Sequence, residues 1–209
     1  LGADGVLQRP AVAIVRVEGQ ILPGDAPDGL FGVGGAYAEL ITRQLRALQR
    51  NPAVKAVVLR VDSPGGEVVA SDEIAKEVKR TREAGKKVVV SMGSLAASGG
   101  YYVSAGADRI LANPTTTTGS IGVIAVIPNA QELLSTLGIQ IQVIKSGPFK
   151  DEGSPFRPLT DEERAIFQRM IDEAYEQFVQ VIAEGRKLDP ARVRDIGDGR
   201  IYTGLQARQ

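Results

Sequence analysis

The first half of the chain alternates short apolar, β-branched runs with amphipathic segments. The apolar runs predict strands, and they comprise residues 11–17, 56–61, 87–92 and 109–112. The amphipathic segments predict helices, and they comprise residues 37–49, 68–84 and 98–105. Two small-residue turns, 62–66 and 93–97, each separate a strand from the following helix. Successive strand, turn and helix units indicate an α/β fold with a parallel sheet and right-handed crossovers.

The second half shows a different pattern. Two apolar, β-rich runs, Ile121 to Ile127 and Ile139 to Ile144, predict strands around a short helix near Gln131 to Leu137. Thr160 and Glu163 then have the spacing of a capping box at the start of a long amphipathic helix. Its apolar stripe, which extends to Ile182, fits core packing or a subunit contact. Between the first strand and first helix, the Gly/Pro-rich stretch from Pro23 to Gly35 predicts a loop.

The composition excludes several kinds of chemistry. The 209 residues include no cysteine and no histidine. A Ser-His-Asp triad, a Cys nucleophile, a disulfide framework and a Cys/His zinc site are therefore impossible within the chain. The 25 basic and 25 acidic residues balance, so no charge excess points to nucleic acid or an anionic membrane surface. We expect no cofactor and no metal.

The length fits one domain, residues 1–209. No uninterrupted apolar run of about 18 residues is present. Because the chain opens on Leu1 and stops at Gln209, we expect a fragment with both ends trimmed.

Ser98 is the candidate nucleophile. It lies among small residues, Ala96-Ala97-Ser98-Gly99-Gly100, where a helix is predicted to begin. Amides at a helix start stabilise a nearby negative charge, so the Gly99 amide could serve an oxyanion hole. Serine is also a common helix N-cap, which is the simpler interpretation.

A second turn, Asp62-Ser63-Pro64-Gly65-Gly66, lies at the end of the preceding strand. The carboxyl ends of parallel strands gather ligand sites in open α/β sheets. The amide of Gly65 or Gly66 could therefore supply the second oxyanion donor.

Without histidine, lysine becomes the candidate general base. Lys145 and Lys150 flank a turn-rich loop with apolar neighbours. Of the other lysines, Lys187 follows the long helix near its C-terminus, Lys55 precedes a strand, and the remaining four lie in or beside a charged helix: Lys76, Lys79, Lys86 and Lys87. A lysine base near pH 7 must have its pKa lowered by about 3 units from about 10.4. Asp151, adjacent to Lys150, would oppose this unless it points elsewhere. These considerations leave Lys145 and Lys150 nearly equal.

Four motifs in order carry a strong resemblance to the signal peptide peptidase A family. They are Asp62-Ser63-Pro64-Gly65-Gly66, Ala96-Ala97-Ser98-Gly99-Gly100-Tyr101-Tyr102, Thr118-Gly119-Ser120-Ile121-Gly122-Val123, and Lys145-Ser146-Gly147-Pro148-Phe149-Lys150-Asp151. The likeness covers nearly the whole chain. It implies a crotonase-like fold, as in the Clp protease, with a long C-terminal helix.

The resemblance also implies roles for individual residues. Ser98 would be the nucleophile and Lys150 the base, with Gly99 and either Gly65 or Gly66 forming the oxyanion hole. Ser120 matches a hydroxyl that orients the lysine. One-domain protomers would form a homo-oligomeric ring in which neighbouring protomers share each active site.

The family degrades remnant signal peptides, cut as extended chains with small or hydrophobic residues near the scissile bond. The resemblance also implies an N-terminal membrane anchor and a C-terminal tail, both of which we expect to be missing from this fragment. It further implies that the catalytic domain lies on the extracytoplasmic side of the cell membrane. Three alternatives remain: a stomatin-associated membrane serine protease of the same fold, a crotonase-type acyl-CoA enzyme with a carboxylate base, and an inactive ring-forming scaffold.

Overall fold

The computed structural model describes residues 9–26 and 34–209. The chain divides into two compact units. Unit 1 comprises residues 1–122 and 177–209, and unit 2 comprises residues 123–176. The predicted loop from Pro23 to Gly35 lies partly outside the described residues.

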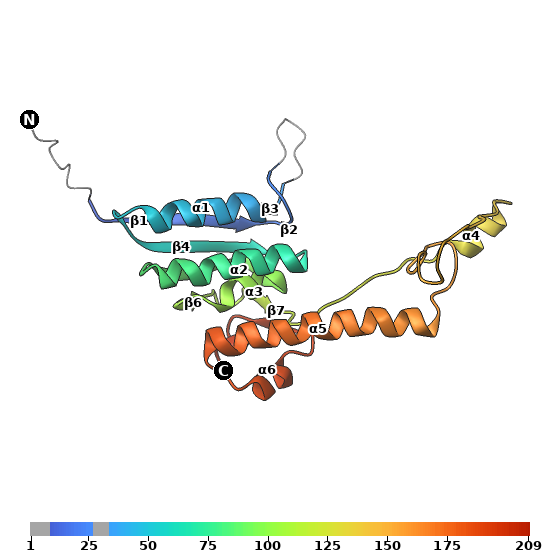
Figure 1. Ribbon diagram of the computed structural model, residues 1–209. Helices are drawn as coiled ribbons and strands as arrows, with labels where there is room; N and C mark the ends of the chain where they lie inside the picture. Colours follow the sequence, from blue (N-terminus) through green and yellow to red (C-terminus); the bar gives the residue numbers. More distant parts are fainter. Residues whose placement is uncertain (1–8, 27–33) are drawn as a thin grey trace, which may run out of the picture. The chain divides into compact units, whose positions relative to one another are not determined.

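Unit 1 is built on a largely parallel sheet in the order β1-β4-β5-β7-β8, with β6 paired to β5 (Figure 1). The strands are β1 (Ala11–Glu18), β4 (Val54–Ser63), β5 (Lys87–Ala97), β6 (Arg109–Leu111), β7 (Thr117–Gly119) and β8 (Ile201–Thr203). Only the β7–β8 pairing within this sheet is antiparallel. A separate parallel pair joins β2 (Ile21–Leu22) to β3 (Ala36–Tyr37). The α/β class with repeated strand, turn and helix units is confirmed.

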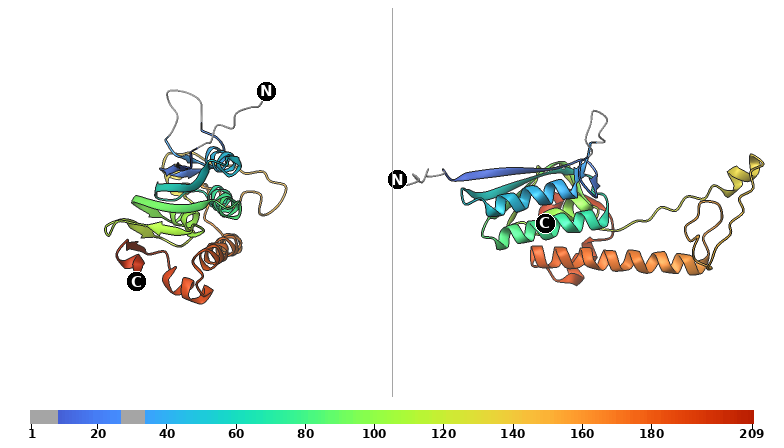
Figure 2. Two further views of the ribbon diagram at one scale, coloured as in Figure 1. Left: turned by 90° about the vertical axis from the view of Figure 1, so that its left-hand side faces the viewer. Right: turned by 45° about the horizontal axis from the view of Figure 1, so that its top comes forward.

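Helices cover one face of this sheet (Figure 2, left). Those of unit 1 are α1 (Ala38–Arg50), α2 (Val68–Glu83), α3 (Gly99–Ala105) and α6 (Pro190–Ile196), followed by a short 3-10 helix, η1 (Gln206–Arg208). Apolar side chains from the β4 strand, such as Leu59, pack with Leu45 of α1 and Ile74 of α2 in one fully buried cluster. This rigid core fixes the ends of β4 and β5, where the candidate site residues lie.

Helix α5 (Asp161–Arg186) begins in unit 2 and ends in unit 1. In unit 1 its residues Phe178, Val179 and Ile182 are buried, and the Phe178 ring lies 4.9 Å from that of Tyr102. In unit 2 its Met170 side chain is 58% exposed. The core of unit 1 therefore accounts for the end of the predicted apolar stripe, whereas Met170 is left largely open to solvent.

Unit 2 contains α4 (Gln131–Thr136), a loop, and the first turns of α5. The capping box is confirmed, because the Thr160 amide donates to Glu163 and the Glu163 amide donates to the Thr160 hydroxyl, at 2.9 and 3.2 Å.

The predicted strands at residues 121–127 and 139–144 are wrong, because the structure has no strand in either segment. A β-rich segment becomes a strand only when a neighbour pairs with its backbone, and no described residue does so here. Ile121 is buried, but most of the apolar side chains that follow are open to solvent: Ile124 is 82% exposed and Ile144 fully exposed.

The predicted turn at residues 93–97 is also wrong, since β5 continues through Ala97. Its last residues pair with Thr117–Gly119 of β7, a strand that the sequence pattern did not reveal. Strand β8 and helix α6 were likewise not predicted. In the described part of the chain, every helix is too short or too polar to cross a bilayer.

Candidate active site

The predicted site residues of unit 1 lie together at the carboxyl ends of strands β4, β5 and β7. Ser63 at the end of β4 pairs with Ala96 of β5, and Ala97 of β5 pairs with Gly119 of β7. The turn after β4, the start of α3 and the residues after β7 therefore meet at the carboxyl ends of parallel strands, as the sequence indicated.

Ser98 occupies a strained backbone conformation between β5 and α3. Its φ of 52° and ψ of −123° are rare for a residue with a side chain and cost about 1–3 kcal/mol. The Ser98 amide donates to the Gly119 carbonyl at 2.9 Å, which helps to hold this conformation. Ser98 precedes α3 but makes no side-chain cap hydrogen bond. Ser98 is thus the N-cap residue of α3 by position, as the simpler interpretation expected, but its hydroxyl does not cap the helix and remains available for chemistry.

The Gly65 turn packs directly against Ser98. Gly65 has φ +95°, and a Cβ added there would lie 2.5 Å from the Gly99 nitrogen and 2.8 Å from the Ser98 Cβ. Only glycine fits this position, for two independent reasons: the left-handed backbone and the close contact.

The two glycines of this turn differ in their hydrogen bonding. The Gly65 amide donates to the Ser63 hydroxyl at 3.1 Å. By contrast, the amides of Gly66 and Gly99 have no acceptor among residues 9–26 and 34–209. A Cβ built on Gly99 would lie 3.2 Å from the Gly66 nitrogen, so the two free amides are near neighbours. Such a pair can stabilise an oxyanion.

Two residues that support this turn were not recognised from the sequence. Ser63 is fully buried and holds the Gly65 amide. Ile21 of β2 accepts from the Glu67 amide at 3.0 Å and donates its own amide to the Gly65 carbonyl at 2.9 Å. The serine two residues before a glycine is a recognisable turn signal. Nothing in the local sequence indicates the contact with Ile21, which lies far away in the chain.

Ser120 follows Gly119 and has φ 50°, a second unusual backbone conformation at the site. Its amide donates to the Arg200 carbonyl at 2.8 Å. Because the Gly119 carbonyl accepts the hydrogen bond from the Ser98 amide, Ser120, the next residue, also lies near Ser98.

Tyr102 anchors the helix that carries the serine turn. Its hydroxyl donates to Asp72 of α2 at 2.9 Å. Burial and then this hydrogen bond raise the pKa of Tyr102 well above its usual range. The hydroxyl therefore stays protonated, and it ties α3 to α2 instead of acting as a base.

Lys150 belongs to unit 2, whereas the other predicted site residues belong to unit 1. It lies in a turn whose backbone bond joins the Lys150 amide to the Gly147 carbonyl at 3.2 Å, and its side chain is exposed. Within the described part of the chain, no acceptor engages its amine. The Lys145 amine, in contrast, donates to Asp151 at 2.6 Å and to the Pro148 carbonyl at 2.8 Å.

A strained serine beside two free glycine amides, at the end of a largely parallel sheet, is an arrangement that can support acyl transfer through a serine. The Clp protease family model matches residues 32–118. The family model of peptidase family S49 matches residues 80–209, and the chain belongs to this family.

Named relatives agree with this assignment. A protein of Enterococcus faecium, provisionally named signal peptide peptidase SppA, is 45% identical over 164 residues, 78% of this chain and 48% of that protein. Protease 4 of Salmonella typhi is 39% identical over 210 residues, 98% of this chain and 33% of that protein. The chloroplastic serine protease SPPA of Arabidopsis thaliana is 34% identical over 200 residues, 95% of this chain and 29% of that protein. The chain thus spans half or less of these relatives' lengths.

Proposed function

We propose that this serine peptidase cleaves peptide bonds with a Ser98–Lys150 dyad and degrades signal peptides left in the membrane after secretion. The observation that carries the proposal is the strained Ser98, whose hydroxyl makes no cap hydrogen bond, beside the free amides of Gly66 and Gly99. The name of the E. faecium relative supports the substrate class.

The chemistry follows from these groups. The neutral Lys150 amine takes the proton of the Ser98 hydroxyl while the serine oxygen attacks the peptide carbonyl. The amides of Gly66 and Gly99 stabilise the resulting oxyanion. Lys150 then donates the proton to the leaving amine, and an acyl-enzyme remains. Water, deprotonated by the same lysine, releases the acyl group and restores Ser98.

The choice of Lys150 over Lys145 rests on their partners. The Lys145 amine is already engaged by Asp151 and by the Pro148 carbonyl, so it is not free to approach a serine hydroxyl. Lys150 has no such partner in the described residues. Ser120, which lies near Ser98, is the proposed hydroxyl that orients it.

Assembly forms part of the proposal. A lysine base requires a desolvated amine, yet the Lys150 side chain is exposed in the single chain. A neighbouring copy can enclose it, as expected for a ring whose protomers share active sites. We place the catalytic domain outside the cytoplasm at the cell membrane, in keeping with the family resemblance.

Complementation between variants tests this function. Purified wild type, Ser98→Ala, Lys150→Ala and Lys145→Ala are assayed on a fluorogenic apolar peptide, alone and mixed. We expect Ser98→Ala and Lys150→Ala to be inactive separately and active after subunit exchange, because the mixture restores sites with both residues.

Lys145→Ala serves as the control and should retain activity. Activity in Lys150→Ala would refute the dyad. Wild type that assembles but neither cleaves peptides nor reacts with a serine-directed probe would favour the scaffold alternative.

A further inference from the structure

One arginine, Arg157, links the loop that carries Lys150 to the first turn of α5 through hydrogen bonds and ion pairs. Arg157 contacts Asp151 through Nε at 3.0 Å and Nη2 at 2.8 Å, and it also bonds the Asp151 carbonyl at 3.1 Å. Asp151 directly follows Lys150, so these bonds fix the backbone immediately beside the lysine.

The same guanidinium reaches the helix. Arg157 bonds Glu163 through Nη1 at 2.8 Å and also through Nη2. The Glu163 side chain is only 2% exposed and belongs to the capping box with Thr160. Arg157 therefore joins Asp151 of the loop to the rigid start of a helix.

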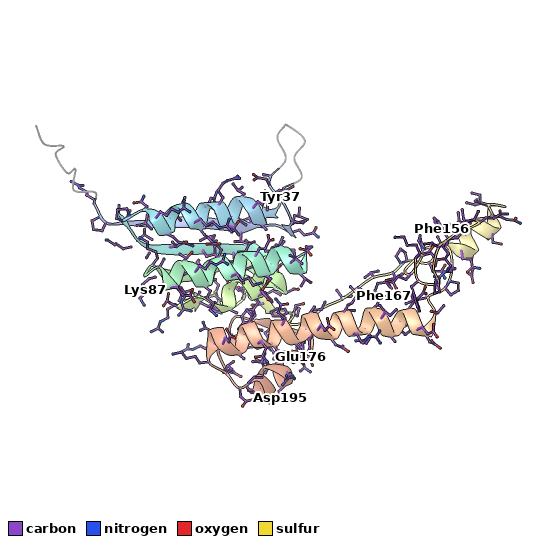
Figure 3. The ribbon with its side chains drawn as sticks, viewed as in Figure 1. Tyr37, Lys87, Phe156, Phe167, Glu176 and Asp195 are labelled. Atoms are coloured by element: carbon purple, nitrogen blue, oxygen red, sulfur yellow. The ribbon has the colours of Figure 1, made fainter. Side chains whose placement is uncertain are left out.

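Packing supports this attachment. Phe167 of α5 (Figure 3) lies against Gly153 of the loop, and a Cβ added to Gly153 would be 3.1 Å from the Phe167 ring. Gly153 also has φ +71°, which favours glycine. The loop thus contacts α5 at an apolar point as well as at the ion pairs.

The charges of Asp151, Glu163, Arg157 and Lys145 balance one another without Lys150. The Arg157 guanidinium, and then Lys145, hold the pKa of Asp151 well below its usual range. Arg157, and then the Thr160 amide, lower the pKa of Glu163 to about 2. Two carboxylates therefore face two cations, and Glu152, the next acidic residue, is exposed.

This arrangement resolves the difficulty posed by Asp151. A carboxylate next to Lys150 in sequence would favour the protonated amine if it faced that amine. Its two oxygens instead bond Arg157 and Lys145. The geometry points to Arg157 as a positioning residue that keeps Asp151 away from the Lys150 amine and fixes the lysine's backbone. This inference rests on the proposed Ser98–Lys150 dyad.

Arginine suits this role better than lysine. Its planar fork donates to two carboxylates at once, whereas an ammonium acts as a point charge. We expect Arg157→Gln to lower kcat about 10- to 100-fold with little change in KM, because a misplaced catalytic group slows the chemical step. The rising limb of the pH-activity profile should also move about one unit upward, since the released Asp151 can pair with Lys150. Arg157→Lys should show smaller changes in the same directions.

The decisive variant is Arg157→Gln combined with Asp151→Asn. Removing the released carboxylate should return the pH limb to its wild-type position while kcat stays low, a result that a purely structural role does not produce. Arg164→Gln, an exposed change in the same turns of α5, is the matched control and should behave as wild type.

Arg157 variants that lose only thermal stability, or whose pH limb stays in place, would overturn the inference. If Arg157→Gln fails to fold, Arg157→Lys is used instead: an upward move of the rising limb of its pH-activity profile supports the inference, and an unchanged limb overturns it. The Lys150→Ala assay separates the two proposals: an inactive Lys150→Ala with fully active Arg157 variants would refute only the positioning role.

Discussion

At the scale of single residues, the site depends on how closely two backbone turns approach each other. Gly65 has no side chain, and this lets the turn after β4 lie against Ser98 and the Gly99 amide. Ser63 takes the Gly65 amide and leaves the Gly66 amide free. The sequence alone could not distinguish the two glycines, because their difference lies in one hydrogen bond.

Gly65→Ala should therefore reduce kcat/KM at least about 100-fold, comparable with the loss of an oxyanion donor. The added Cβ would lie 2.5 Å from the Gly99 nitrogen and force the turns apart. Gly85→Ala is the matched control, because Gly85 has a similar φ of +81° but nothing within 4 Å of the added Cβ. It should lose about 1–2 kcal/mol of stability and keep its activity. Equal activity of the two variants would show that the close approach is not needed.

At the scale of elements, local patterns predicted the first half of the chain well and the second half less well. Strand β4 and helix α2 matched their predicted ranges closely, since burial within one chain produces their patterns. Residues 139–144 show the same β-rich pattern, but no strand among the described residues pairs with them. An apolar sequence pattern predicts which side chains are to be buried, but it does not predict whether the element that buries them belongs to the same chain. The φ of Ser98 was equally beyond prediction, because the bond that helps to hold it comes from Gly119 of β7, which is distant in the sequence.

Helices α1 and α2 are joined by a buried carboxylate, and this pairing makes stability depend on pH. Glu77 is 1% exposed and accepts hydrogen bonds from Gln49, Arg46 and Arg80. Burial raises the pKa of Glu77, but these bonds outweigh burial, so the pKa is lowered overall. The stabilisation is therefore present above the unfolded-state value of about 4.3 and is lost as the pH falls through the folded-state value.

Glu77→Gln should accordingly be about 1.5–3 kcal/mol less stable than wild type at pH 7, as expected for bonds to a charged group. The difference should shrink below about pH 4. Chemical denaturation across this range measures it, with the exposed Glu73→Gln on the same helix as control. A difference that does not vary with pH would contradict the role of the charge.

At the scale of the whole molecule, the most exposed apolar residues gather in unit 2. Ile124 and Val126 are 82% and 79% exposed, and Ile144 is fully exposed. We propose that these exposed side chains take part in a contact with another copy of the chain. Lys150 lies in the same unit, six residues after Ile144. Burying these side chains in the proposed ring would also remove water from around Lys150, the proposed general base, which would link assembly to activity.

Ile144→Asp should therefore abolish both assembly and peptidase activity while unit 1 keeps its fold. Burying an isoleucine contributes about 1.5–3 kcal/mol at each contact, and a charge there opposes association. Sedimentation velocity over a range of concentrations, with specific activity measured on the same samples, tests the link. Val12→Asp, at a 63% exposed position on the edge strand β1, is the control and should assemble normally. Activity in a monomeric Ile144→Asp would show that one chain completes the site, and the shared-site proposal would then be abandoned while the Ser98 chemistry stands.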